Sequence, residues 1–211
     1  MPAKTIEEAQ RYFTDVLGLT SDDYTALHLD VANMINTEVK AIYDIFGDVN
    51  AGGHLRGFRI TDRLLPGETA NYSRVSKEIS LRKDDVMHET SLAKMGNLAR
   101  SEFETGCWST NKPEHAVRHE LGHAVGYWFT KTDVVKYNKI SVLRNQLLSD
   151  SGINEWDRVK NTRVQKLAAG RLISYYALMS NNELIAESIA EYMAGNPRET
   201  AKKVIHILIG G

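Results

Sequence analysis

Apolar side chains recur at helical spacing over much of the 211-residue chain. Through residues 22–46 they follow one another every three or four positions, and Ser21 stands where it could cap the first turn. The same spacing predicts helices over the following ranges: 6–17, 134–148, 156–176, 182–194 and 198–209. The chain is therefore predicted to be mainly helical.

A different pattern interrupts the helices between residues 47 and 82. Glycines over residues 47–57 indicate a turn, after which residues 58–60 and 72–81 have the composition of strands, with Pro66 and Gly67 turning the chain between them. Residues 84–100 fit a connecting helix or a loop, and residues 102–111 fit an irregular segment or a short strand. The order of the elements predicts one α+β domain over residues 1–211. Its expected segments are the following: helices over residues 1–46, a small sheet over residues 57–82, a central helix over residues 113–129 and further helices over residues 133–209.

The central helix carries apolar and polar chemistry on different faces. Pro113 suits its first turn, and Thr110 or Asn111 could cap it. One face is expected to meet the core through five residues: Val117, Leu121, Ala124, Val125 and Trp128. His119 and His123 fall nearly opposite this stripe, which disfavours two histidines that serve only as core residues.

Residues 119–123 read His-Glu-Leu-Gly-His, an H-E-x-x-H motif. Histidines at i and i+4 of a helix lie about 5–6 Å apart at Cβ, so both imidazoles can bind one zinc ion. Glu120, between them, would face the metal-bound water. The motif predicts His119 and His123 as zinc ligands and Glu120 as the general base of a hydrolase. Gly122 and Gly126 lie beside the face that carries the histidines and present no side chain there, although glycine lowers the helix propensity of the segment.

A hydrolytic zinc site needs a third protein ligand and one open position for water. Phe129 stands where the metzincin pattern has its third histidine, which excludes that class, and His206 lies in an apolar terminal helix. The remaining candidates are carboxylates, because Glu183, Glu187 and Glu191 follow one another at four-residue spacing. A solvated acidic face is the alternative interpretation of this spacing.

The motif and the downstream sequence Glu-Leu-Ile-Ala-Glu over residues 183–187 resemble the gluzincin metallopeptidases. The likeness is to the family of the anthrax lethal factor catalytic domain, secreted Pro-Pro endopeptidases and related domains of phage head proteins and bacterial toxins. It covers about residues 113–194. The resemblance implies a zincin-like fold in which His119, His123 and Glu183 hold Zn²⁺, Glu187 supports a ligand histidine, and Tyr176 donates a hydrogen bond to the oxyanion.

Two of these assignments have an alternative. Tyr175 is adjacent to Tyr176, so the tyrosine could be displaced by one position. Ser180 and Glu183 also fit a helix capping box, in which the Glu183 carboxylate would bond the Ser180 backbone N–H. In that case Glu187 would be the third ligand.

The resemblance implies a zinc-dependent endopeptidase acting on a protein or peptide. Independently of the resemblance, we expect an extended substrate to add to the sheet edge at residues 77–83. One alternative is a zincin-like structural or interaction module of a phage particle or toxin, with the metal serving stability alone. The other is a metal-dependent hydrolase of a non-peptide amide.

Composition narrows the expected partners. The net charge is −1 and no apolar run approaches a membrane span, so neither nucleic acid nor a membrane is expected as a partner. Cys107 is the single cysteine, which excludes an internal disulfide, fits a reducing compartment and suggests a small buried residue. The first residues lack a signal-peptide pattern, so a cytoplasmic or virion-associated location is expected. The oligomeric state is left open.

Overall fold

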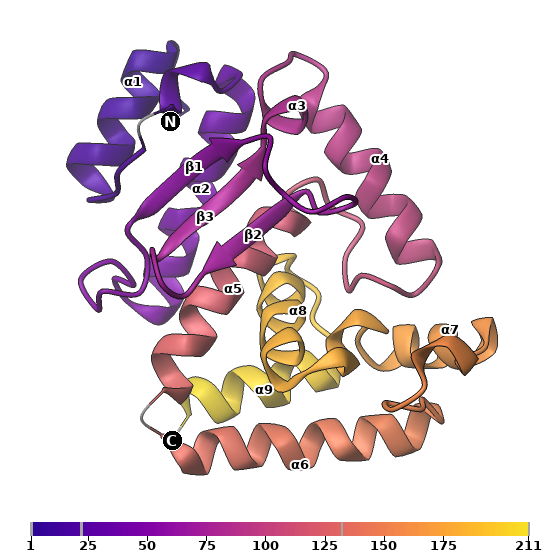
Figure 1. Cartoon of the computed structure of the whole chain (residues 1–211). Coiled ribbons are helices and arrows are strands. Elements are labelled where there is room, and N and C mark those ends of the chain that lie inside the picture. Colours follow the sequence, from indigo (N-terminus) through magenta and orange to yellow (C-terminus); the bar gives the residue numbers. More distant parts are fainter. Residues whose placement is uncertain (1, 22, 132, 211) are drawn as a thin grey trace.

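The computed structural model describes residues 2–21, 23–131 and 133–210 and has an α+β fold (Figure 1). The chain begins with α1 (Ile6–Arg11), which continues as a π-helical turn over Tyr12–Val16 and matches the helix predicted over residues 6–17. The helix predicted from residue 22 begins later, as α2 (Leu29–Phe46). The predicted first residue, Asp22, lies outside the described residues.

Burial of one aromatic side chain explains the late start of α2. Residues Tyr24–Ala26 form a separate 3-10 turn. The turn places the Tyr24 ring 4.5 Å from that of Phe13, and the Tyr24 hydroxyl donates to Oδ1 of Asn36 at 2.8 Å. In place of the predicted Ser21, His28 caps α2 by accepting the Asp30 N–H.

The sheet consists of β1 (Gly57–Thr61), β2 (Ala70–Ser73) and β3 (Glu78–Arg82) in the order β1-β3-β2. β1 pairs with β3 in parallel, and β2 pairs with β3 antiparallel. The strand predicted over residues 72–81 is therefore a hairpin, which turns at Lys77 with a left-handed φ of 63°. Because β3 is the central strand, the predicted substrate edge at residues 77–83 is wrong. Among the described residues, β2 is the sheet edge that contacts α5.

The chain reaches the central helix through α3 (Lys83–Val86) and α4 (Ser91–Glu104), after which residues 105–114 are irregular. The central helix is α5 (His115–Thr130), close to the predicted range 113–129. Neither of the predicted caps, Thr110 and Asn111, caps α5. Glu114 stands at the cap position without a side-chain bond, because the Thr110 hydroxyl instead lies 3.1 Å from Nδ1 of His115.

α5 lies between the sheet and α8 (Asn181–Met193), as Figure 1 shows. Four members of its predicted core stripe are fully buried, whereas Trp128 is partly buried. Gly122 and Gly126 face α8 directly. A Cβ atom at Gly122 would lie 2.8 Å from the Cα of Ala186, and one at Gly126 would lie 2.8 Å from Cγ2 of Ile185. The two glycines therefore allow the close approach of the helices.

The carboxy-terminal region is helical, although one predicted helix is wrong. α6 (Val134–Ser151) and α9 (Glu199–Ile209) lie close to their predicted ranges. Residues 156–176 instead form a 3-10 turn (Arg158–Lys160), α7 (Arg163–Leu172) and the start of a second 3-10 turn (Tyr176–Met179). A capping box between Thr162 and Gln165 begins α7, and Ile173, whose φ of −161° is not helical, ends it. Tyr176 is thereby separated from α7.

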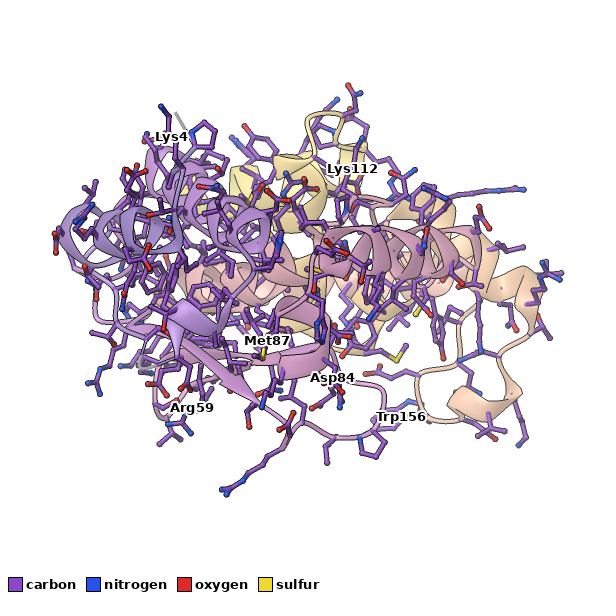
Figure 2. The ribbon with its side chains drawn as sticks, turned by 90° about the horizontal axis from the view of Figure 1, so that it is seen from above. Lys4, Arg59, Asp84, Met87, Lys112 and Trp156 are labelled. Carbon is purple, nitrogen blue, oxygen red and sulfur yellow. The ribbon has the colours of Figure 1, made fainter. Side chains whose placement is uncertain are left out.

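Figure 2 shows the molecule from above, with Lys4 and Lys112 toward one side and Arg59 and Asp84 toward the opposite side. Arg59 belongs to β1 and Asp84 to α3, so the sheet and the short helix after it lie at the same side. Within the described ranges, no helix is both long and apolar enough to cross a membrane.

Candidate metal centre

Two histidines of α5 and one carboxylate of α8 meet at a single point. Nε2 of His119 lies 3.0 Å from Oε2 of Glu183, and Nε2 of His123 lies 3.4 Å from the same oxygen. Ligands bound to one tetrahedral zinc at about 2.0–2.1 Å are separated from each other by about 3.3–3.4 Å. The His123 contact lies at this separation and the His119 contact is somewhat shorter, so each nitrogen lies close to the place of a ligand that shares an ion with Oε2.

Oε2 of Glu183 gives a second indication. This atom is buried, and among the described residues it has no hydrogen-bond partner. Its short contact with His119 therefore lacks the alignment of a hydrogen bond. A buried carboxylate oxygen without a hydrogen bond is costly unless a positive charge neutralises it, and that charge is either the protonated His119 ring or a bound cation. The predicted capping box forms only partially, because Ser180 Oγ accepts the Glu183 N–H at 3.1 Å while the Glu183 carboxylate faces the histidines.

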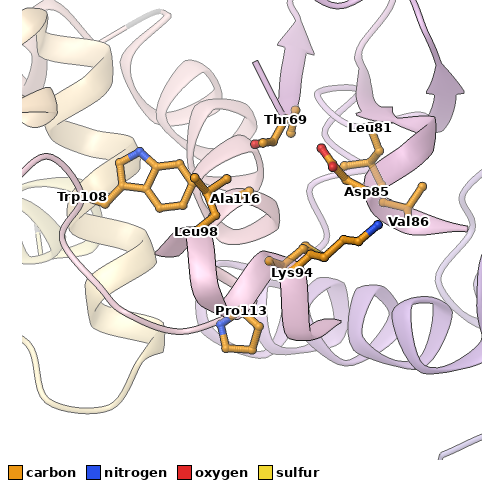
Figure 3. A pocket seen from close by; sticks show the side chains of 11 residues that line it. Thr69, Leu81, Asp85, Val86, Lys94, Leu98, Trp108, Pro113 and Ala116 are labelled. Atoms are coloured by element: carbon orange, nitrogen blue, oxygen red, sulfur yellow. The ribbon is translucent and has the colours of Figure 1, made fainter. Parts of the chain in front are cut away.

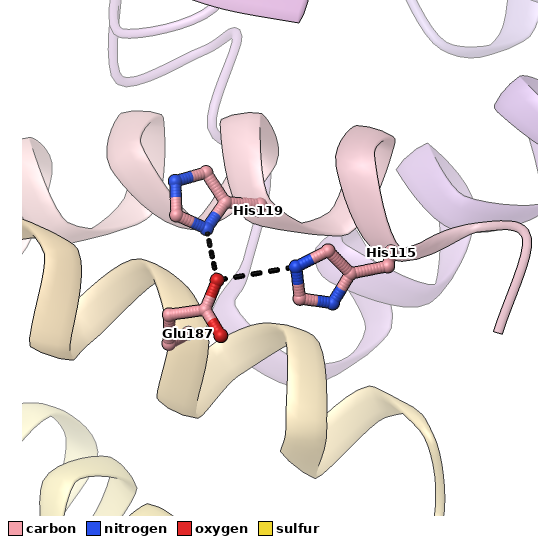
Figure 4. A group of neighbouring side chains, drawn as sticks. All are labelled: His115, His119 and Glu187. Carbon is pink, nitrogen blue, oxygen red and sulfur yellow. Dashed lines mark hydrogen bonds and ion pairs between the residues drawn. The ribbon is translucent and has the colours of Figure 1, made fainter. Parts of the chain in front are cut away.

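A second cluster consists of His115, His119 and Glu187, and it lies on the Nδ1 side of the His119 ring (Figure 4). Oε1 of Glu187 lies 2.9 Å from Nδ1 of His119 and 3.1 Å from Nε2 of His115. The other oxygen accepts the Ser109 N–H at 2.7 Å. These three buried side chains lie close enough together to hold a metal ion.

The hydrogen bonds of the second cluster distinguish it from the first. Both Glu187 oxygens have partners, and Thr110 Oγ1 contacts the remaining nitrogen of His115. Glu187 is fully buried and His115 is 1% exposed, whereas the side chains of His123 and Glu183 are 16% and 19% exposed, so the first cluster is the more open to water. In Figure 4 the second ring nitrogen of His119 points away from Glu187. Glu187 therefore fixes the His119 ring and leaves its Nε2 directed toward Glu183.

The sequence interpretation missed His115. Its signal was the same four-residue spacing that joins His119 to His123, continued one turn earlier on α5. Trp108 stacks on the His115 ring at 4.3 Å and 19°. The contacts of Ser109 join an irregular segment to Glu187 of α8, 78 residues further along the chain, so no local pattern indicated them.

The two carboxylates are held as anions. Burial raises the pKa of Glu183, but His119 and His123 outweigh it and lower that pKa to about 2. Burial likewise raises the pKa of Glu187, and His115 and His119 lower it well below the usual range. Burial lowers the pKa of His119, whereas Glu183 and Glu187 raise it well above its ordinary value. The cluster therefore concentrates negative charge that a proton or a divalent cation can neutralise.

Glu120 is held by the edge strand. It is 8% exposed, and its Oε2 accepts the Tyr72 backbone N–H at 2.6 Å. That N–H faces away from β3, as alternate N–H groups of an antiparallel edge strand do. Glu191, the third glutamate of the α8 series, does not reach the site because its Oε1 accepts from Arg198 Nε at 2.7 Å.

Tyr176, and not Tyr175, lies beside the histidines. Its ring centroid is 5.6 Å from that of His119, and with His119 and Glu120 it lines a cavity of about 270 Å³. Burial, followed by Glu183 and Glu120, raises the pKa of Tyr176 above its usual range, so the phenol keeps its proton. Tyr175 packs against the core and carries Lys166 Nζ at 5.0 Å over its ring.

Cys107 also lines this cavity and is partly buried. Burial, followed by Glu102, raises the pKa of its thiol to about 12, so the thiolate that a metal would need is disfavoured.

A smaller apolar pocket of about 140 Å³ adjoins the cavity and shares Ala70, Trp108 and Ala116 with it. Figure 3 shows Trp108 at one end of this pocket and Asp85 with the Lys94 ammonium at the other. The apolar portion of its wall is made by eight side chains: Ala70, Leu81, Val86, Met95, Leu98, Trp108, Pro113 and Ala116.

The chain matches no protein-family model, no characterised protein and no solved structure in comparisons of its sequence and fold.

Proposed function

We propose that the protein is a zinc-dependent endopeptidase of the zincin type, with His119, His123 and Glu183 as metal ligands. The observation that carries this proposal is the approach of both Nε2 atoms to the same buried oxygen of Glu183, Oε2. Two neutral imidazoles and one carboxylate suit zinc and leave a net charge of about +1. Zinc bound there would polarise a carbonyl and lower the pKa of a water molecule.

The neighbouring side chains are suited to the proton transfers of peptide hydrolysis. Glu120 would accept the proton of the attacking water and return it to the leaving amine. The Tyr72 N–H holds Oε2 of Glu120, so Oε1 is the oxygen available for this transfer. The Tyr176 hydroxyl would donate a hydrogen bond to the developing oxyanion. Glu187 would keep His119 in the tautomer and ring orientation that a ligand needs.

The surroundings of the site favour a peptide over a small amide. β2 presents a strand edge beside Glu120, to which an extended chain can add. The apolar pocket beside Ala70 would accept one substrate side chain. A purely structural metal site would have no need of the open cavity in front of Glu120 and Tyr176.

Metal analysis combined with peptide cleavage tests the proposal. Purified protein should contain about one equivalent of zinc and should cut members of a degenerate peptide library, as detected by mass spectrometry. Glu120→Gln should keep the zinc and lose at least about a hundredfold in turnover. A zinc-loaded protein that cleaves no peptide would refute the endopeptidase function. A chain that binds no zinc would refute the site as well.

A further inference from the structure

Basic side chains surround Tyr127, one helical turn beyond His123. Residues 115, 119, 123 and 127 follow one another at four-residue spacing on α5, so Tyr127 continues the histidine face about 6 Å further along the axis. Over its ring lie Lys77 Nζ at 4.3 Å, Lys131 Nζ at 5.4 Å and Arg74 Cζ at 5.5 Å from the centroid. We call Arg74, Lys77 and Lys131 the basic cluster.

The positive charge of the basic cluster is not neutralised within the protein. Across the described residues, none of its three members forms an ion pair with a carboxylate. His54 lies beside them, with its ring 5.4 Å from that of Tyr127 and its Nδ1 buried without a hydrogen-bond partner. Burial, followed by Lys77 and Lys131, lowers the pKa of His54. Three cations without a counter-ion therefore attract an anion from outside.

β2 connects the basic cluster with the candidate metal centre. Tyr72, which bonds Glu120, precedes Arg74 by two residues, and Arg74 is the first residue of the turn that follows β2. At the other end of β2, Ala70 lines the apolar pocket. A peptide that adds antiparallel to this edge runs against the direction of β2. Its chain would thus pass from the basic cluster, past Glu120, to the apolar pocket.

We propose that the basic cluster binds acidic side chains of the substrate, at the second and third residues before the scissile bond. The position of the scissile bond rests on the proposed endopeptidase function, whereas the binding of the acidic side chains does not. The position of the basic cluster favours an acidic peptide as its partner, because the cluster lies next to a strand edge to which an extended peptide can add.

Two matched peptides test the proposal. One contains Glu-Glu-Ala-Leu and the other Gln-Gln-Ala-Leu, with identical flanks and the Ala–Leu bond as the expected cut. Zinc-loaded protein should cleave the Glu peptide with a kcat/KM about fivefold higher at low ionic strength, the scale of an exposed charge pair. The preference should shrink in about 0.5 M salt because exposed charges are screened.

Variants of the basic cluster test whether it causes the preference for the Glu peptide. The double variant Arg74→Gln/Lys131→Gln should reduce the ratio of the two kcat/KM values to below about twofold. Lys139→Gln removes an exposed positive charge of α6 far along the chain from β2, and should leave the fivefold ratio intact. An equal ratio for wild type and the double variant would overturn the proposal.

Measurements of peptide binding distinguish a failure of this proposal from a failure of the proposed function. Fluorescence anisotropy with zinc-loaded Glu120→Gln protein measures the affinity of both labelled peptides without cleavage. Tighter binding of the Glu peptide by a protein that cleaves neither this peptide nor any member of the degenerate library would support the basic cluster and refute the endopeptidase. Cleavage of both peptides at equal rates, with equal affinities, would refute the basic cluster and leave the endopeptidase standing.

Discussion

Gly122 of α5 packs directly against the backbone of Ala186 in α8. A Cβ at this glycine would lie 2.8 Å from the Cα and 3.0 Å from the carbonyl oxygen of Ala186. Glu183 and Glu187 stand on either side of Ala186 in the sequence, so the distance between the two helices sets the distance between the carboxylates and the histidines.

The first prediction concerns this contact. Gly122→Ala should push α8 away, destabilise the protein by about 1–3 kcal/mol and weaken zinc binding at least tenfold. Thermal unfolding and zinc competition with a chelating dye measure the two effects. The matched control is Gly96→Ala in α4, where a Cβ meets Pro113 at an ordinary 3.7 Å. It should stabilise the protein by about 0.5–1 kcal/mol and keep zinc affinity. Equal zinc affinity in both variants would contradict this account of the glycine.

The second prediction separates the two glutamates of α8. Glu183→Ala should remove nearly all bound zinc, because it deletes a proposed ligand. Glu187→Ala should weaken zinc binding by about 10–100-fold, because it frees the His119 ring without deleting a ligand. Zinc dissociation constants decide between them. If Glu187→Ala is the more damaging change, the ligand is Glu187, as the capping interpretation of Glu183 would require.

The third prediction concerns the tyrosine. Tyr176→Phe should keep zinc affinity and lower turnover by about a hundredfold, because a hydrogen bond to the oxyanion acts in the transition state. Tyr175→Phe is the control and should be silent, since Tyr175 packs against the core and lies outside the cavity lining. The reverse result would move the oxyanion donor to Tyr175.

The fourth prediction is the pH dependence of zinc affinity. Burial lowers the pKa of His119, but Glu183 and Glu187 raise it well above its ordinary value, so the metal-free protein holds a proton there at neutral pH. That proton must leave before Nε2 can bind metal, so the apparent affinity should rise as the pH rises toward this raised pKa. Competition titrations between about pH 6 and pH 9 measure the slope. An affinity that is constant over this range would show that binding displaces no proton.

The sequence predicted those features of the site that are local. The α+β class is confirmed, and α5 with its buried stripe follows from helical periodicity because nearly every contact of that stripe is apolar. The pairing of β2 with β3 was missed because the turn over residues 74–77 contains neither glycine nor proline, and Lys77 adopts its left-handed φ of 63°. The hydrogen bonds to Glu187 were missed because they join segments that only the tertiary fold brings together.

The helix predicted over residues 156–176 failed for a different reason. Its apolar residues do follow helical spacing, but two local polar interactions compete with a continuous helix. The Asn161 side-chain amide bonds the backbone N–H and carbonyl of Asn154, and Thr162 caps α7. Such hydrogen bonds between side chains and backbone cannot be predicted from the spacing of apolar residues.

Anomalous diffraction at the zinc edge, from crystals grown with zinc, locates the bound ion directly. We expect one strong peak within about 2.3 Å of His119 Nε2, His123 Nε2 and a Glu183 oxygen, with the fourth position facing Glu120. A peak between His115, His119 and Glu187, or no ordered peak at either cluster, would contradict the proposed metal centre.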